Sequence, residues 1–386
     1  MFALALALSL AAPQTPPETG VPVLAADSEA RWVPFELTRH NQIRFAMTLN
    51  GRPATAILDT GMTDSVASPA FAASVGLKPG VAGTAEAIGG RVAIRWAATK
   101  ALTLAGLSRS GGRIAIADLA ALGGGDASAD LLIGGDLLAC CALDIDYDAR
   151  RFRLLPSGRL PFRGATLPLR AAEGNNAWVT ELSLGGRRLR PILIDTGDGA
   201  AVTLARNAWS ATGLGQPATT TIAYGLGGPV VSQVAIVPEL AFPGLAARDV
   251  EIRIEGEGGF STRTGSAGRI GTGFLQGYRV LLDPRAGRLL LAPGARAAAP
   301  PLRSTSGLLL GYEGDRLRVL HVMANSPAAT GGWKQGETIC QVDGAAVPAS
   351  VSANGLTAWS VGAPGRVMKL GLCDGSERDL TLRNFY

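Results

Sequence analysis

The stretch Ile57-Leu58-Asp59-Thr60-Gly61 recurs 136 positions later as Leu193-Ile194-Asp195-Thr196-Gly197. In each copy an apolar run predicts a strand that delivers a carboxylate to a turn, which glycine permits because it has no Cβ. One Asp-Thr-Gly alone is ordinary turn chemistry. Two copies behind the same kind of apolar run indicate a duplication.

Other landmarks repeat in the same order along the chain. The matching pairs are Gly89-Gly90 with Gly227-Gly228, Leu132-Ile133-Gly134 with Arg269-Ile270-Gly271, and residues 146–154 with residues 283–291. A duplicated unit keeps its landmarks in register, as these do. The sequence therefore predicts two related lobes in one chain.

The local pattern within each lobe is that of β-structure. Residues 46–57 predict two strands around an Asn50-Gly51 turn, and residues 179–194 repeat this around Gly185-Gly186. Helical signals are few and short, such as residues 68–75. We therefore predict an all-β fold.

The order of these motifs resembles that of the retropepsin and pepsin aspartic proteases. The resemblance covers residues 30–296, with a first lobe at 30–158 and a second at 162–296. It implies two barrel-like lobes whose carboxylates, Asp59 and Asp195, meet across a cleft. The catalytic loops would be supported by Thr60, Gly61, Thr196 and Gly197.

A pair of carboxylates suits the hydrolysis of peptide bonds. Two like charges close together cannot both ionise cheaply, so the pair shares a proton, as is well known for aspartic proteases. One carboxylate then takes a proton from water while the other donates a proton to the peptide carbonyl. This mechanism needs no cofactor or metal, and either Asp fits either role.

Each lobe also carries a candidate substrate-binding flap. Residues 84–92 have Gly89 and Gly90 at their tip, and residues 221–231 have Gly227 and Gly228. A flap must open for substrate and close over it, although each hairpin alone also reads as an ordinary turn. Their matched placement favours flaps.

The chain departs from the family pattern three positions after each candidate catalytic Asp. Met62 and Asp198 stand where these enzymes carry Ala, Ser or Thr. An inward Asp198 would raise the proton affinity of the dyad, the pair formed by Asp59 and Asp195. We expect it instead to face solvent or a backbone donor, as loop Asp residues usually do.

Residues 302–386 change character and resemble a bacterial PDZ domain. The resemblance rests on Ser306-Gly307-Leu308, Ser326-Pro327-Ala328-Ala329 and Val342-Asp343-Gly344. It implies a small α+β domain that binds an extended peptide by strand addition and holds its terminal carboxylate. By position, Ser306, Gly307 and Leu308 match the carboxylate loop, beside a helix at 354–361. The alternative is a groove that only packs against the lobes.

Residues 1–20 predict a signal peptide followed by a linker. Residues 2–12 form an apolar run too short to span a bilayer, although no basic segment precedes it. We therefore expect export, to a periplasm if the source is bacterial. No other stretch predicts a transmembrane span.

Composition excludes several other classes of protein. The net charge of +5 comes from dispersed arginines, and aromatic residues make up 5% of the chain, so nucleic-acid binding is not expected. The two histidines, His40 and His321, suggest no metal site. We expect Cys140 and Cys141 to be buried free thiols, whereas Cys340 and Cys373 can pair in an exported protein.

Taken together, the motifs predict an aspartic endopeptidase that acts on peptide or protein substrates. Its PDZ-like domain would recruit peptides, with a C-terminal peptide as its possible ligand. The rival interpretation is a catalytically silent adaptor whose cleft binds peptides without cutting them. Retention of both Asp59 and Asp195 favours the enzyme, and Asp198 leaves room for the rival.

Overall fold

The computed structural model describes residues 16, 18–120, 129–172, 177–348 and 358–386. The predicted all-β fold is confirmed, because strands dominate, helices are short, and a further domain follows the lobes. The predicted signal segment lies almost wholly outside the described residues. The helices are η1 Ser28–Ala30, α1 Pro69–Ser74, α3 Gly135–Leu138, α4 Arg206–Ala211, α5 Phe260–Arg263, α6 Thr272–Leu275, α7 Pro327–Thr330 and η2 Ala358–Val361.

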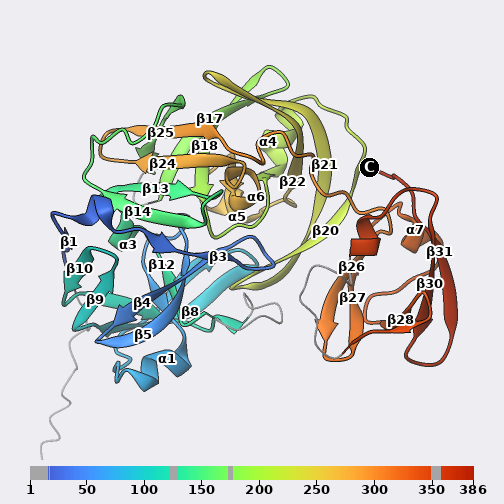
Figure 1. Ribbon diagram of the computed structural model, residues 1–386, viewed down its shortest axis with the longest axis horizontal. Helices are drawn as coiled ribbons and strands as arrows, with labels where there is room; N and C mark the ends of the chain where they lie inside the picture. Colours follow the sequence, from blue (N-terminus) through green and yellow to red (C-terminus); the bar gives the residue numbers. More distant parts are fainter. Residues whose placement is uncertain (1–15, 17, 121–128, 173–176, 349–357) are drawn as a thin grey trace, which may run out of the picture.

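The first lobe is built on one large sheet (Figure 1). Its strands are β1 Pro22–Leu24, β3 Glu36–Leu37, β4 Ile43–Leu49, β5 Arg52–Leu58, β6 Val66–Ala67, β7 Ala82–Ala87, β8 Gly90–Ala98, β9 Ala101–Leu104, β10 Leu107–Ser110, β11 Arg113–Ile116 and β12 Leu131–Ile133. Because β1 pairs with β10, this lobe begins before residue 30, where the sequence placed its start. The predicted turn joins β4 and β5, with positive φ at Asn50 and Gly51.

The second lobe repeats this plan in its own sheet. Its strands are β16 Arg170–Ala171, β17 Trp178–Leu184, β18 Arg187–Asp195, β19 Val202–Leu204, β20 Ala218–Gly225, β21 Gly228–Phe242, β22 Leu245–Ile254 and β23 Gly268–Gly271. In both lobes the strand before Asp-Thr-Gly lies parallel to a later strand, β5 to β12 and β18 to β23. The carboxylate thus leaves the core at the same point of each sheet.

A third sheet joins the two lobes. Its strands are β2 Val33–Pro34, β13 Ala142–Asp146, β14 Arg151–Leu155, β15 Ala165–Pro168, β24 Tyr278–Asp283 and β25 Arg288–Pro293. Strand β13 follows the first lobe in the chain and β24 follows the second, and they pair antiparallel with Leu143 opposite Leu282. One hydrophobic core runs through all three sheets, so the lobes form a single packed body.

The C-terminal strands form a separate domain beside β20 and β21 (Figure 1). Its strands are β26 Leu308–Glu313, β27 Arg316–Val322, β28 Thr338–Val342, β29 Ala345–Ala346, β30 Val367–Leu372 and β31 Glu377–Thr381. It has a hydrophobic core of its own. Of the predicted helix at 354–361, only the turn η2 lies within the described residues.

Candidate active site

The two Asp-Thr-Gly loops meet back to back at the junction of the lobes. The amide of Thr60 donates to the Thr196 hydroxyl oxygen at 3.1 Å, and the amide of Thr196 donates to the Thr60 hydroxyl oxygen at the same distance. Each hydroxyl in turn donates at 2.8 Å to a carbonyl of the opposite lobe, at Ile194 and at Leu58. Both threonines are buried, so these four bonds hold the loops in one fixed arrangement.

The glycines bring the two carboxylates together. A Cβ added at Gly61 would lie within 3 Å of the Asp195 carboxyl group, and one added at Gly197 would lie equally close to that of Asp59. Each glycine therefore packs against the carboxylate of the other lobe, where any side chain would collide. The two carboxyl groups are close enough for the charge of Asp195 to raise the pKa of Asp59.

Backbone amides hold each carboxylate in place, but not equally. Asp59 Oδ1 accepts the Gly61 amide at 3.0 Å. Asp195 Oδ1 accepts two amides at 3.0 Å, from Gly197 and Asp198. The second lobe thus gives its carboxylate one more donor.

Burial raises the pKa of both carboxyl groups. For Asp195, burial and the charge of Asp198 outweigh the nearby Arg269 and the amide donors, and the pKa rises to about 6. For Asp59, burial and the charge of Asp195 raise the pKa well above its ordinary value. The pair therefore holds a proton over a wide range of pH, as general acid and base catalysis requires.

The predicted flap tips meet each other. A Cβ at Gly89 would collide with the backbone of Gly227 and Gly228, and one at Gly227 with the backbone of Gly89 and Gly90. The Gly227 amide donates to the Ile88 carbonyl oxygen at 2.9 Å. Glycine is needed here because the two hairpins touch through their backbones.

A contact from the second lobe holds the first of the two predicted flaps, and sequence reasoning missed it. Arg263, at the end of α5, donates to Glu86 Oε2 and to the Ala87 carbonyl oxygen, both at 3.0 Å. Both acceptors lie on β7, the outer strand of the flap hairpin. Arg91, within the same hairpin, also pairs with Glu86, at 3.2 Å.

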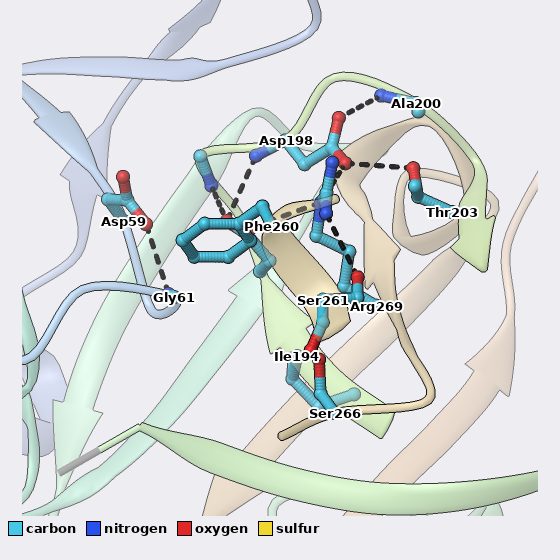
Figure 2. Close-up of polar contacts among 12 residues, drawn as sticks. Asp59, Gly61, Ile194, Asp198, Ala200, Thr203, Phe260, Ser261, Ser266 and Arg269 are labelled. Atoms are coloured by element: carbon cyan, nitrogen blue, oxygen red, sulfur yellow. Dashed lines mark hydrogen bonds and ion pairs between the residues drawn. The ribbon is translucent and has the colours of Figure 1, made fainter. Parts of the chain in front are cut away.

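Asp198 is buried rather than exposed to solvent, which corrects one of the two expected orientations. It accepts the Ala200 amide at 2.9 Å, the expected kind of backbone donor. Its other oxygen accepts from Arg269 Nε at 2.6 Å and from the Thr203 hydroxyl at 3.1 Å. Figure 2 shows this group gathered around Asp198 and Arg269, with Asp59 apart from it beside Gly61. Charge from Arg269 and Arg253 overcomes burial and lowers the pKa of Asp198 to about 2.

Sequence reasoning used Arg269 only as a landmark of the repeat and missed its contact with Asp198. Arg269 is 2% exposed and occupies the position that Leu132 takes in the first lobe. The available signal was an arginine inside an apolar segment ending in glycine, where a strand is buried on both faces.

The C-terminal domain contacts the second lobe next to the flap. The Thr220 hydroxyl and His321 Nε2 lie 2.8 Å apart, and the Thr219 hydroxyl donates to the Ala324 carbonyl oxygen at 2.6 Å. A cavity of about 660 Å³ lies beside this contact, and its lining includes Gly197 and Leu309. The cavity thus extends from the base of the second Asp-Thr-Gly loop to strand β26.

The predicted carboxylate loop of the C-terminal domain does not offer its amides to a ligand. The amide of Ser306 donates to the Ser360 carbonyl oxygen at 3.1 Å, and that of Gly307 to the Ser304 hydroxyl at 2.9 Å. The amide of Leu308 donates to the Ser306 hydroxyl at 3.1 Å. The carboxylate-binding role of Ser306, Gly307 and Leu308 stays a prediction, and in this conformation their amides are used by Ser360, Ser304 and Ser306.

Both cysteine pairs form disulfides. Cys340 is bonded to Cys373, which joins β28 to the end of β30. Cys140 and Cys141 are bonded to each other, so the expectation that they are free thiols is wrong. Their adjacency within a tight turn after α3 brings the two sulfurs together.

Neither a metal cluster nor a membrane helix is found in the described part of the chain. Its His, Cys, Asp and Glu side chains form no group of three or more that could hold a metal ion. None of the helices described is long and apolar enough to cross a bilayer.

Comparison with known proteins adds one finding. A family described as aspartyl protease has a model that matches residues 45–137, a segment that contains Asp59 and the first flap. No curated protein matches the chain. The family match supports a protease-type function in coarse terms and lies in the lobe that carries the first Asp-Thr-Gly.

Proposed function

We propose that the protein is an aspartic endopeptidase. The observation that supports the proposal is the reciprocal Thr60–Thr196 contact, together with the packing of Gly61 and Gly197 against the carboxylates of the opposite lobe. A water molecule bound between the carboxylates would lose a proton to the ionised one and attack the peptide carbonyl. The protonated one would donate to the carbonyl oxygen, which gives a tetrahedral diol. The carboxyl group that took the proton from water would then give it to the amide nitrogen as the C–N bond breaks, and the other carboxylate would take back a proton from the diol.

Closure of the flaps supports the same chemistry. Gly89 and Gly227 meet, and the neighbouring Ile88 lines the same cavity as Gly197, so the closed tips would shield the reacting water and carbonyl from bulk solvent. An extended peptide would enter only when the hairpins part. Substrate binding would therefore be coupled to flap motion.

The test is cleavage of a peptide library by purified protein. We expect Asp59→Asn and Asp195→Asn each to lower the rate at least about a hundredfold, because each removes one half of the acid and base pair. Asp315→Asn is the matched control, since it makes the same change in an exposed turn of the C-terminal domain. Cleavage that survives both dyad substitutions would place the chemistry elsewhere.

The second candidate function is that of a catalytically silent peptide-binding adaptor. Its supporting observation is the buried Asp198, whose charge acts on Asp195. Peptides that bind the wild-type protein and the dyad variants equally well, and that stay uncut at every pH, would favour the adaptor.

We propose that the C-terminal domain binds an extended peptide segment along β26. This strand lies at an edge of its sheet, paired with β27 on one side, and it borders the cavity beside the second lobe. Because the amides of the predicted carboxylate loop are occupied, recognition would not require a free C-terminus. Peptides with amidated and free C-termini should then bind equally well, and strong dependence on the free carboxylate would contradict this.

We also propose that the protein is exported. The Cys340–Cys373 disulfide fits an oxidising compartment such as the periplasm. Fractionation of cells that express the full chain tests this. Finding the protein with reduced cysteines in the cytosol would overturn it.

A further inference from the structure

The two lobes differ at one equivalent set of buried positions next to their carboxylates. In the first lobe, Val66 pairs with Ala115 on one side and Leu132 on the other. In the second lobe, Thr203 pairs in the same way with Arg253 and Arg269. Ala117 and Glu255 form one more equivalent pair. The amide of Ala117 donates to the carbonyl oxygen at the end of β6, and the amide of Glu255 donates to the carbonyl oxygen at the end of β19.

The first-lobe set is apolar. Val66, Ala115, Ala117 and Leu132 belong to one buried hydrophobic cluster, against which Met62 packs. The second lobe has charged or polar groups at every one of these places. They are Thr203, Arg253, Glu255 and Arg269, with Asp198 in the place of Met62, and we call these five residues the charged cluster. Burying charges costs free energy even when they are paired, so an exchange at all five positions indicates a functional reason.

Arg269 is the centre of the charged cluster. Its Nε lies 2.6 Å from Asp198 Oδ2, and its Nη1 lies 2.6 Å from Glu255 Oε1. The same Nε lies 3.7 Å from Asp195 Oδ2. The guanidinium is held by two carboxylates so that its third neighbour is the second carboxylate of the dyad.

Asp59 has no equivalent cation. Within the described residues, no Arg, Lys or His nitrogen lies within 4 Å of its carboxylate, and it accepts one backbone amide where Asp195 accepts two. A negative charge on Asp195 is thus opposed by a guanidinium and two amides, whereas one on Asp59 is opposed by a single amide.

We infer that the charged cluster fixes the polarity of the dyad, with Asp195 as the ionised general base and Asp59 as the carboxylic acid that donates the proton. Arg269 is a positioning residue in this scheme, because it acts through Asp195. The names general base and acid rest on the proposed function. The location of the proton does not depend on it.

Other charges near the dyad set the size of the effect. Asp198 carries a negative charge that opposes ionisation of Asp195, and Arg253 Nη1 lies 3.8 Å from Asp198 Oδ1 and partly offsets it. Glu255 faces Arg269, while Glu251 interacts with Arg253 and Asp198. Neither of these glutamates contacts Asp195. Opposite shifts are therefore expected from removing Arg269 and from removing the charge of Asp198.

Direct titration of the two carboxyl groups tests the polarity without any need for activity. In protein labelled with ¹³C at aspartate Cγ, the signals are assigned by their loss in Asp59→Asn and in Asp195→Asn. In the pH range in which the pair holds one proton, the wild-type signal lost in Asp195→Asn should be that of a carboxylate, and the signal lost in Asp59→Asn that of a protonated acid. The reverse assignment, or identical titration of both groups, would overturn the inference.

Variants of the charged cluster test its cause. Arg269→Leu, which installs the residue of the first lobe, should raise the titration midpoint of Asp195 by at least about one pH unit, a tenfold change in proton affinity. Asp198→Asn should lower it, and Arg269→Lys should restore most of the wild-type value. Folded variants with an unchanged midpoint would contradict the inference. If Arg269→Leu does not fold, Asp198→Asn still decides the matter, because a purely structural role predicts no downward shift.

The outcome is separable from that of the proposed function. A dyad with the predicted polarity in a protein that cuts no peptide would refute peptide hydrolysis and leave the polarity standing. Cleavage by a protein whose proton rests on Asp195 would do the opposite.

Discussion

Thr60 and Thr196 exchange hydrogen bonds reciprocally, the amide of each donating to the hydroxyl oxygen of the other at 3.1 Å. The contact spans the interface between the lobes and lies directly beneath both carboxylates. The position of each carboxylate therefore depends on a residue of the opposite lobe.

Replacing either threonine by valine should reduce both stability and activity. Thr60→Val leaves the Thr196 amide and the Ile194 carbonyl oxygen without their partner in a buried site, at a cost of about 1–3 kcal/mol. Thr60→Ser keeps the hydroxyl and is the matched control. Thr60→Val should be less stable in denaturant and cleave peptide more slowly than Thr60→Ser. Equal stability and equal cleavage rates of the two variants would contradict this role for the hydroxyl.

The raised pKa of Asp195 predicts the acidic limit of activity. Below about pH 6 this carboxyl group becomes protonated in the folded protein, so a dyad that needs one ionised carboxylate should lose activity as the pH falls through this value. A pH–rate profile of kcat/KM measures the limit. Full activity at pH values far below it would contradict the assignment.

The same shift predicts how stability depends on pH. The folded-state pKa of about 6 lies above the ordinary value of 3.8, so the folded protein binds the proton more tightly than the unfolded chain does. The contribution of Asp195 to stability is therefore full below about pH 4 and is lost as the pH rises through about 6. Unfolding free energies of wild type and Asp195→Asn should diverge over this range, with the variant gaining relative stability at higher pH. A constant difference would contradict the shift.

Arg263 is expected to act as a latch on the first flap. Arg263→Gln should weaken the link from α5 to Glu86 and Ala87, so the flap should open more readily. Amide hydrogen exchange in β7 and β8 should speed up, and KM should change more than the stability of the protein. Arg91→Gln is the matched control, because it removes a partner of the same Glu86 from within the hairpin. Equal effects of the two variants would argue against a latch between lobes.

The Cys340–Cys373 disulfide should stabilise the C-terminal domain. It closes a loop with a sequence separation of 33, and loss of such a bond typically costs about 2–4 kcal/mol. Paired serine substitutions should lower the unfolding free energy of this domain in a denaturant titration. The matched control is the double serine variant at Cys140 and Cys141, which should leave the C-terminal domain unaffected.

Much of the fold of the two lobes can be predicted from the sequence, because turn glycines and alternating apolar residues are local signals. Asn50-Gly51 and Gly185-Gly186 could be read directly as hairpin turns, and both copies of Asp-Thr-Gly as strand ends. The short strand β1 could not, since Pro22–Leu24 has a partner only in the assembled sheet.

The polar contacts around the site were harder to predict than its loops. Asp198 looks like any loop aspartate until Arg269, 71 residues away, is seen beside it. The same holds for the Arg263 latch, whose partner Glu86 lies in the other lobe. The sequence motif Ser306-Gly307-Leu308 also does not reveal that serine hydroxyls accept hydrogen bonds from the amides of this loop.

The sheet shared by β13 and β24 has a consequence for how the protein behaves when it is dilute. Because Leu143 and Leu282 lie on neighbouring strands of one polypeptide, the two halves of the site cannot drift apart as separate subunits would. The two Asp-Thr-Gly loops are therefore always present in equal number and close to each other. Assembly of the carboxylate pair is therefore an event of folding, complete in a single molecule, and independent of how many copies surround it.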